Sequence, residues 1–115
     1  MTPKEFEQEI SRFEYALKGR RAKITWDAKI PDPDNPHQLR QVDILIEEKK
    51  EVTIVECRHH KKKQDMKWVE EIYGRKVSLE AFSAIAVSSS GFTSGAIKKA
   101  ERLGVILRKF EEVTN

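Results

Sequence analysis

The segment that most constrains the fold of this chain is residues 41–58, QVDILIEEKKEVTIVECR. Apolar and polar residues alternate in two runs that a short charged turn separates, and this pattern is typical of a β-hairpin. If the turn is centred on residues 49–50, Asp43 lies directly opposite Glu56, with Cβ atoms about 4.5–5.5 Å apart. The alternation assigns the opposite face of the first strand to Val42, Ile44 and Ile46.

Two carboxylates at that separation repel each other unless a proton or a cation lies between them. Mg²⁺ and Mn²⁺ prefer oxygen ligands, so the candidate metal ligands are Asp43, Glu56 and the backbone carbonyl of Cys57. Arg58 lies on the face of Glu56, where it can stabilise negative charge that develops on a phosphate. The alternative is a cross-strand salt-bridge ladder, and the hairpin alone leaves both interpretations open.

The segments before the hairpin predict a helix, a strand and a loop. A capping box formed by Thr2 and Glu5 begins a helix that ends at Gly19. Residues 22–30 alternate as a half-buried strand, and the proline-rich segment 31–38 is a loop. The expected inward positions are Phe6, Ile10, Phe13 and Leu17 on the helix, and Ile24, Trp26, Ala28 and Ile30 on the strand.

The segments after the hairpin alternate between helix and strand. We expect helices over about 64–81 and up to Leu103, and strands at 84–87 and 105–107. The expected inward positions on these helices are Val69, Ile72, Tyr73, Val77, Ala96, Ile97, Ala100 and Leu103. The order αβββαβαβ predicts an α/β fold in which helices flank a mixed β-sheet, built as one domain over 1–115.

Charge is more informative in its distribution than in its sum. The chain has 22 Lys and Arg against 19 Asp and Glu, a net charge of +3. Basic residues gather directly after Glu56, in the run Arg58, His59, His60, Lys61, Lys62 and Lys63. Phosphates attract such a run, although a solvated surface is the alternative. No run reaches the ~18 apolar residues of a membrane span, and the single cysteine fits a reducing, cytoplasmic setting.

Two further segments carry polar groups that are suited to phosphate. Ser88, Ser89 and Ser90 follow a buried strand and precede a helix, a position where hydroxyls and N–H groups often bind anions. The segment lacks the glycine-lysine signature of a P-loop, which argues against a nucleotide cofactor. Gln64 lies where its amide can reach a phosphate or a metal-bound water, whereas the Cys57 side chain points to the core.

The sequence resembles the PD-(D/E)xK nuclease superfamily, in particular its Mrr-like, restriction-endonuclease-like members. The resemblance rests on Val42-Asp43, on IVECR at 54–58 and on AIAVSSSGFTSGAIKKAERLGV at 84–105. It implies that Asp43 and Glu56 bind the metal ion, that Arg58 takes the place of the family's lysine, and that Gln64 is the polar residue of the next helix. It also implies an acidic residue on the first helix, and both Glu9 and Glu14 are candidates.

Two positions depart from the pattern of that superfamily. Val42 stands where many members have proline, and Arg58 keeps its charge, so it cannot act as a base in the way lysine can. From the resemblance we expect a Mg²⁺- or Mn²⁺-dependent DNA endonuclease, with residues 59–63 and 88–90 holding the DNA backbone. A catalytically inactive module that binds nucleic acid or a protein partner is the alternative, and a dimerising structural fragment is a third. Cleavage of both strands implies a homodimer.

Overall fold

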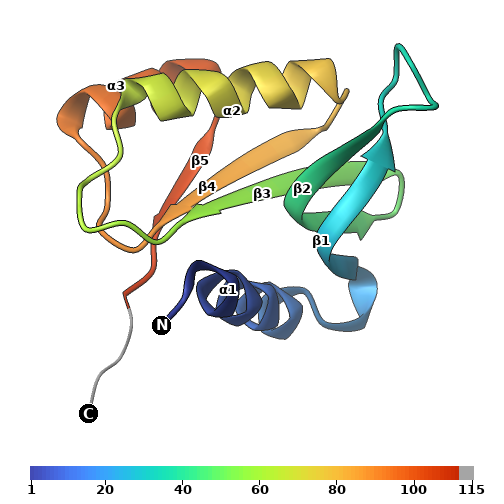
Figure 1. The fold of residues 1–115 in the computed structure, drawn as a ribbon, viewed down its shortest axis with the longest axis horizontal. Helices are drawn as coiled ribbons and strands as arrows, with labels where there is room; N and C mark the ends of the chain where they lie inside the picture. The colour runs from blue at the N-terminus through green and yellow to red at the C-terminus, as the bar shows by residue number, and fades with distance from the viewer. Residues whose placement is uncertain (112–115) are drawn as a thin grey trace.

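The computed structural model of the protein describes residues 1–111 and shows a five-stranded mixed sheet between helices (Figure 1). The strands lie in sequence order; β1, β2 and β3 are antiparallel neighbours, and β4 and β5 continue parallel to β3. Helix α1 covers one face, and α2 and α3 cover the other. The predicted α/β fold and element order are confirmed. The elements are α1 (Pro3–Lys18), a 3₁₀ turn (Gly19–Arg21), β1 (Lys23–Pro31), β2 (Leu39–Glu48), β3 (Glu51–Arg58), α2 (Met66–Ser78), β4 (Ser83–Ser88), α3 (Ser94–Leu103) and β5 (Ile106–Lys109).

Helix α1 begins with the predicted capping box of Thr2 and Glu5 and ends at Gly19, whose φ is 62°. Its inward stripe differs from the prediction beyond the second turn. Phe6 and Ile10 are buried, but Phe13 and Leu17 are exposed, and Glu14 takes the next inward position. The cause is an ion pair between Glu14 and Arg108 of β5, which lets a carboxylate occupy a buried site.

Strands β1 and β2 exchange faces at Asp27 and Asp43. Trp26 and Ile44 pack beneath α1, whereas Ala28 and Val42 pack beneath α2 and α3, so strict alternation is wrong for both strands. The switch coincides with Asp27, whose φ of 50° lies in the left-handed region. Ile30 follows Ala28 to the α2 side. One pair of strands therefore contributes to both hydrophobic layers.

Helix α2 begins two residues later than predicted. Asp65 is its N-cap, and its carboxylate accepts the backbone N–H groups of Lys67 and Trp68. Gln64 instead forms a parallel bridge with Phe92, so the residue is tied to the β4–α3 connection before the helix starts. Trp68 is buried, whereas Val77, which was predicted to point inward, is exposed.

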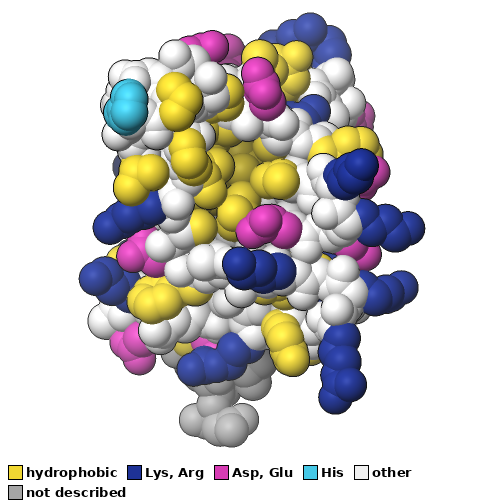
Figure 2. Space-filling model, turned by 90° about the vertical axis from the view of Figure 1, so that its right-hand side faces the viewer, with side chains coloured by type: hydrophobic (Ala, Val, Ile, Leu, Met, Phe, Trp, Pro, Cys, Tyr) yellow, Lys and Arg dark blue, Asp and Glu magenta, His cyan; other side chains and the backbone are white. Residues whose placement is uncertain are grey.

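Helix α3 begins at its N-cap Thr93 and ends at Gly104, which has a left-handed φ of 76°. Ala96 and Ala100 pack inward as predicted, but Ile97 is exposed. The molecular surface seen from the side of the β1–β2 loop carries many charged side chains around a hollow lined by hydrophobic ones (Figure 2). No helix within residues 1–111 has the length and apolar character needed to cross a membrane.

Candidate active site on the β2–β3 hairpin

The hairpin has the register that the sequence predicts, and its strands separate where the carboxylates lie. Ile44 pairs with Val55 and Leu45 with Ile54, and the β2–β3 pairing ends there. Beyond this point a side chain replaces the backbone as hydrogen-bond acceptor: Asp43 Oδ2 accepts the N–H of Cys57 at 2.9 Å. Asp43 is thereby fixed at the point where the two strands diverge.

Glu56 is the buried acid of this site, with 8% of its surface exposed. Burial, and next the adjacent Asp43 carboxylate, raise its pKa to about 8, although Arg75 acts in the opposite direction. A carboxyl with this pKa holds a proton at neutral pH in the free protein. Two ionised carboxylates at this distance would repel each other, so the Asp43–Glu56 pair binds either a proton or a cation.

Arg75 and Gln41 complete the surroundings of the two carboxylates. Arg75 Nε lies 3.0 Å from Glu56 Oε1, and its Nη2 donates to the Gln41 carbonyl. Gln41 Nε2 in turn donates to Asp43 at 3.2 Å and to Asp27 at 3.1 Å. Sequence reasoning missed both residues. The one available signal was helical spacing, since Arg75 follows Trp68 and Ile72 on the inward side of α2.

Arg58 does not contact Glu56. Its Nη1 donates to Gln64 Oε1 at 2.9 Å, its Nη2 lies 3.8 Å from Glu71, and its guanidinium stacks 4.8 Å from the Trp68 ring centre. Gln64 is 6% exposed and also donates to the Lys62 carbonyl. Gln64 therefore holds Arg58 in place at the mouth of the site.

A cavity of about 260 Å³ joins these groups. It is too small for a base pair, but a phosphate group with a few waters fits it. Predicted and unpredicted residues line it together: Gln41, Asp43, Glu56, Cys57, Arg58, Trp68, Glu71, Ile72 and Arg75.

The acidic residue of the first helix that lies near Asp43 is Glu7. Burial raises its pKa, and the nearby Asp43 carboxylate raises it further, while the Trp26 indole N–H donates to Glu7 at 3.3 Å. The two expected candidates have other partners: Glu9 pairs with Arg12 at the surface, and Glu14 pairs with Arg108. A choice by helical spacing alone missed Glu7, because its proximity to Asp43 depends on how α1 packs against the sheet.

The donor set fits a hard divalent cation held by few protein ligands. Within residues 1–111 no three His, Cys, Asp or Glu side chains form a ready cluster for a metal ion. Mg²⁺ commonly binds one or two carboxylates and keeps several waters. Asp43, the raised-pKa carboxyl of Glu56 and the Cys57 carbonyl meet that requirement. The Cys57 side chain packs against the hydrophobic cluster beneath α1, and burial and the surrounding carboxylates raise the pKa of its thiol far above the usual range.

The sequence matches one protein family over residues 1–115, Mrr_cat, described as restriction endonuclease. The chain belongs to this restriction endonuclease family. No curated protein matches the sequence. The family assignment agrees with the α/β fold and with the order of its elements.

Several solved structures share the restriction-endonuclease-like fold of this family member. One is the protein of unknown function AF1548, with a TM-score of 0.76 and 16% identity, over 92% of this chain and 57% of that chain. EndoMS in its apo form has a TM-score of 0.66 and 15% identity, over 99% and 48%. Can2 from Sulfobacillus thermosulfidooxidans, solved with cyclic tetra-adenylate, has a TM-score of 0.72 and 17% identity, over 89% and 31%. The chain therefore spans between 31% and 57% of these three proteins.

The basic run of this restriction endonuclease domain lies beside the β4–α3 turn. Lys61, Lys62 and Lys63 are exposed, as a phosphate-binding surface requires. His59 differs from the DNA-facing prediction, because its half-buried ring stacks on Phe6 at 5.0 Å. The exposed His60 contributes its backbone carbonyl to the turn.

The three serines of the turn serve its own structure. Ser88 is fully buried, and its Oγ accepts the N–H groups of Ser90 at 3.2 Å and Gly91 at 3.1 Å. The hydroxyls of Ser89 and Ser90 both donate to the His60 carbonyl. The expectation that Ser88 contacts phosphate directly is wrong, because its side chain is out of reach of any ligand. The turn instead holds the basic run against the sheet.

Proposed function

We propose that the chain is a divalent-metal-dependent DNA endonuclease domain that hydrolyses phosphodiester bonds. The observation that carries this proposal is the buried Glu56 beside Asp43, at the point where two strands of a restriction endonuclease family fold separate. A structural salt-bridge ladder would pair each acid with a base. Here Asp43 has no cationic partner among the described residues, and Glu56 keeps a pKa of about 8 despite Arg75.

Asp43, Glu56 and the backbone carbonyl of Cys57 would hold Mg²⁺ or Mn²⁺. The ion, when bound, supplies Lewis acidity at the phosphoryl oxygen and lowers the pKa of a bound water. The protein contributes a rigid donor set. The Cys57 N–H fixes Asp43, and Arg75 orients Glu56 through a bond of 3.0 Å.

Arg58 would stabilise the negative charge that grows on the phosphate as it reacts. Arginine stays protonated at all relevant pH values, so it serves as a fixed cation and not as a general base. Its contact with Gln64 sets the direction of the guanidinium before substrate arrives. Gln64 is thus a positioning residue in this proposal.

The DNA backbone would lie across the exposed lysines that follow the site, Lys61, Lys62 and Lys63, with the exposed His60 beside them. Lysine ammonium groups bind phosphates as point charges without reading sequence. We further propose a single domain over residues 1–115, acting as a homodimer in the reducing cytoplasm. Cleavage of both strands of a duplex needs two such sites.

The experiment is a plasmid cleavage assay with Mg²⁺, Mn²⁺ or EDTA. Asp43→Asn keeps the size of the side chain and an acceptor for the Cys57 N–H, but removes one charged ligand. We expect cleavage with either ion, none with EDTA, and a loss of at least 100-fold in the variant. Glu70→Gln, exposed on α2 and outside the cavity, is the matched control and should retain activity. Equal activity of Asp43→Asn and wild type would refute the assignment.

A second candidate is a catalytically inactive nuclease-like module that binds nucleic acid or a protein partner. The observation that favours it is Arg58, which stands in the lysine position and is held by Gln64, Glu71 and Trp68. Calorimetric titration with Mn²⁺ separates the two candidates. Ion binding that Asp43→Asn abolishes supports the nuclease, while DNA binding without any ion binding supports the inactive module.

A further inference from the structure

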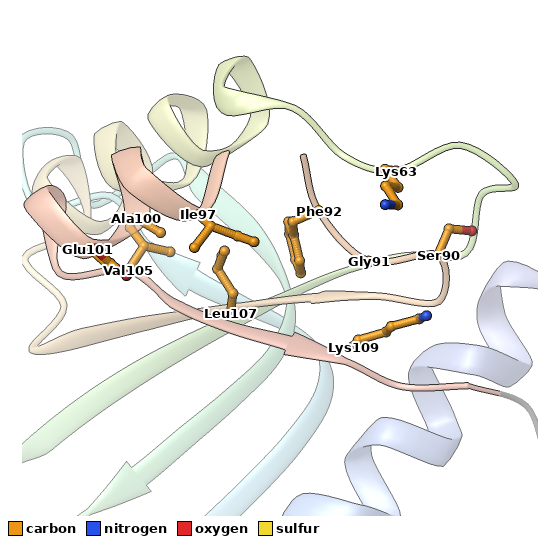
Figure 3. A pocket seen from close by; sticks show the side chains of 10 residues that line it. All are labelled: Lys63, Ser90, Gly91, Phe92, Ile97, Ala100, Glu101, Val105, Leu107 and Lys109. Carbon is orange, nitrogen blue, oxygen red and sulfur yellow. The ribbon is translucent and has the colours of Figure 1, made fainter. Parts of the chain in front are cut away.

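A hydrophobic groove lies on the opposite edge of the sheet from β1. It has a volume of about 510 Å³ and runs between α3 and β5 (Figure 3). Phe92, Ile97 and Leu107 form its apolar walls, and Ile97 is 46% exposed. The groove and the cavity beside Glu56 share no lining residue, although Lys63 of the proposed DNA-binding surface lies at one end of the groove.

The groove borders an open strand edge. β5 is the last strand of the sheet, and within residues 1–111 it pairs only with β4. Its outer backbone N–H and C=O groups are therefore available to another strand. Ile106 on the same strand is 45% exposed. An open edge next to apolar side chains is the arrangement that strand addition from another chain requires.

Charge is distributed unevenly along the groove. Lys63 and Lys109 project at one end, beside Ser90, and Glu101 lies at the other end (Figure 3). A DNA strand would meet Glu101 and apolar walls, so the groove does not suit it. When a second copy is turned by a two-fold rotation, its glutamate end faces the lysine end of the first copy, and the reverse. The surface is therefore complementary to itself in charge.

We propose that two copies of the chain pair through β5, antiparallel and edge to edge, about a two-fold axis at Leu107. With a two-fold axis perpendicular to the sheet, residues that lie opposite each other on the two β5 strands point to the same face of the joined sheet. Centring on Leu107 sets Lys109 of one copy opposite Val105 of the other, next to Glu101. Centring on Arg108 would set two arginines against each other, which is unfavourable.

Of two ion pairs within each copy, one favours this register and the other competes with it only weakly. Arg108 is turned to the α1 face, where it pairs with Glu14, so it leaves the groove side of β5 apolar at Leu107. Lys109 pairs with Glu111, but both side chains are more than half exposed, and such surface pairs break readily. This interface gives a structure to the homodimer of the proposed function. Its role in cleavage rests on that proposed function, but the pairing itself needs neither DNA nor a cation.

The first test is a charge exchange read by sedimentation velocity, without DNA or divalent ions. Wild type should form a dimer, and Glu101→Lys and Lys109→Glu should each raise the dimer dissociation constant at least tenfold. The double variant should recover most of that affinity, because the opposite charges meet again. Glu70→Lys on exposed α2 is the control and should leave the dimer intact. A wild type that stays monomeric at about 200 µM would overturn the proposal.

The second test is disulfide trapping in a Cys57→Ser background. At the two-fold axis the Cα atoms of position 107 would lie about 4.5–5.5 Å apart, within disulfide range. Leu107→Cys should therefore oxidise to a covalent dimer, and Phe82→Cys, exposed elsewhere, should not. A dimer that does not cross-link at position 107 would show a different interface and refute this one. Either failure leaves the cleavage assay on Asp43 unaffected.

Discussion

Glu56 should make this protein less stable as the pH rises. Its pKa is about 8 in the folded protein against a usual value of 4.5. Below pH 4.5 both the folded and unfolded states are protonated, so the group has no effect. Between pH 4.5 and 8 the unfolded chain ionises while the folded protein keeps its proton, and the free energy of unfolding falls with each pH unit. Above pH 8 both states are ionised and the curve is level.

The magnitude follows from the size of that shift. One pKa unit corresponds to about 1.4 kcal/mol, so a shift from 4.5 to about 8 costs roughly 5 kcal/mol in full. Glu56→Gln keeps an acceptor for Arg75 and cannot ionise. We therefore expect this variant to equal wild type near pH 4.5 and to be more stable by several kcal/mol at pH 8.

The assay is urea unfolding followed by tryptophan fluorescence, in EDTA, at each pH unit from 5 to 9. The difference between Glu56→Gln and wild type isolates the one carboxyl, because every other group titrates in both proteins. It should rise by about 1.4 kcal/mol per pH unit and level off near pH 8. Glu71→Gln provides the control and should follow wild type. A constant difference across the whole range would refute the raised pKa and the site geometry behind it.

Three further outcomes follow from the interactions of single groups. Arg75→Gln removes the cation beside Glu56 and should raise the pKa of that carboxyl further, so unfolding curves should show stability still falling above pH 8; levelling at the wild-type pH would contradict this. Ser88→Ala leaves the buried Gly91 N–H and the half-buried Ser90 N–H without their acceptor and should cost about 1–3 kcal/mol in urea unfolding, against about 0.5 or less for exposed Ser94→Ala. Replacing Lys61, Lys62 and Lys63 by alanine should flatten the salt dependence of DNA binding, by roughly 0.9 in log–log slope for each phosphate that the protein no longer neutralises, while Lys29→Ala should not.

Local signals were sufficient for the elements and for the central pair of acids. The capping box at Thr2, the stop at Gly19 and the hairpin turn each depend on residues within a few positions of one another. The hairpin register followed from the turn, and with it the proximity of Asp43 and Glu56. These features are predictable because short-range sterics and hydrogen bonds determine them.

The remainder of the site depends on how distant elements pack. Arg75 reaches Glu56 across 19 positions, and nothing near either residue indicates the ion pair. Glu7 lies near Asp43 because of the way α1 crosses the sheet. Ser88 resembled an anion-binding residue, but burial of the β4 end directs its hydroxyl to the turn. A single sequence contains no information on such packing beyond helical spacing.

The exchange of faces at Asp27 and Asp43 has a consequence for how this domain can evolve. On one side of these residues β1 and β2 contribute to the hydrophobic layer beneath α1, and on the other side to the layer beneath α2 and α3. Asp43, a proposed metal ligand, therefore lies where the two layers meet. Substitutions that loosen either layer will therefore shift Asp43. Selection for activity and selection for stability act on the same residues, so we expect few changes in either layer to be neutral for both.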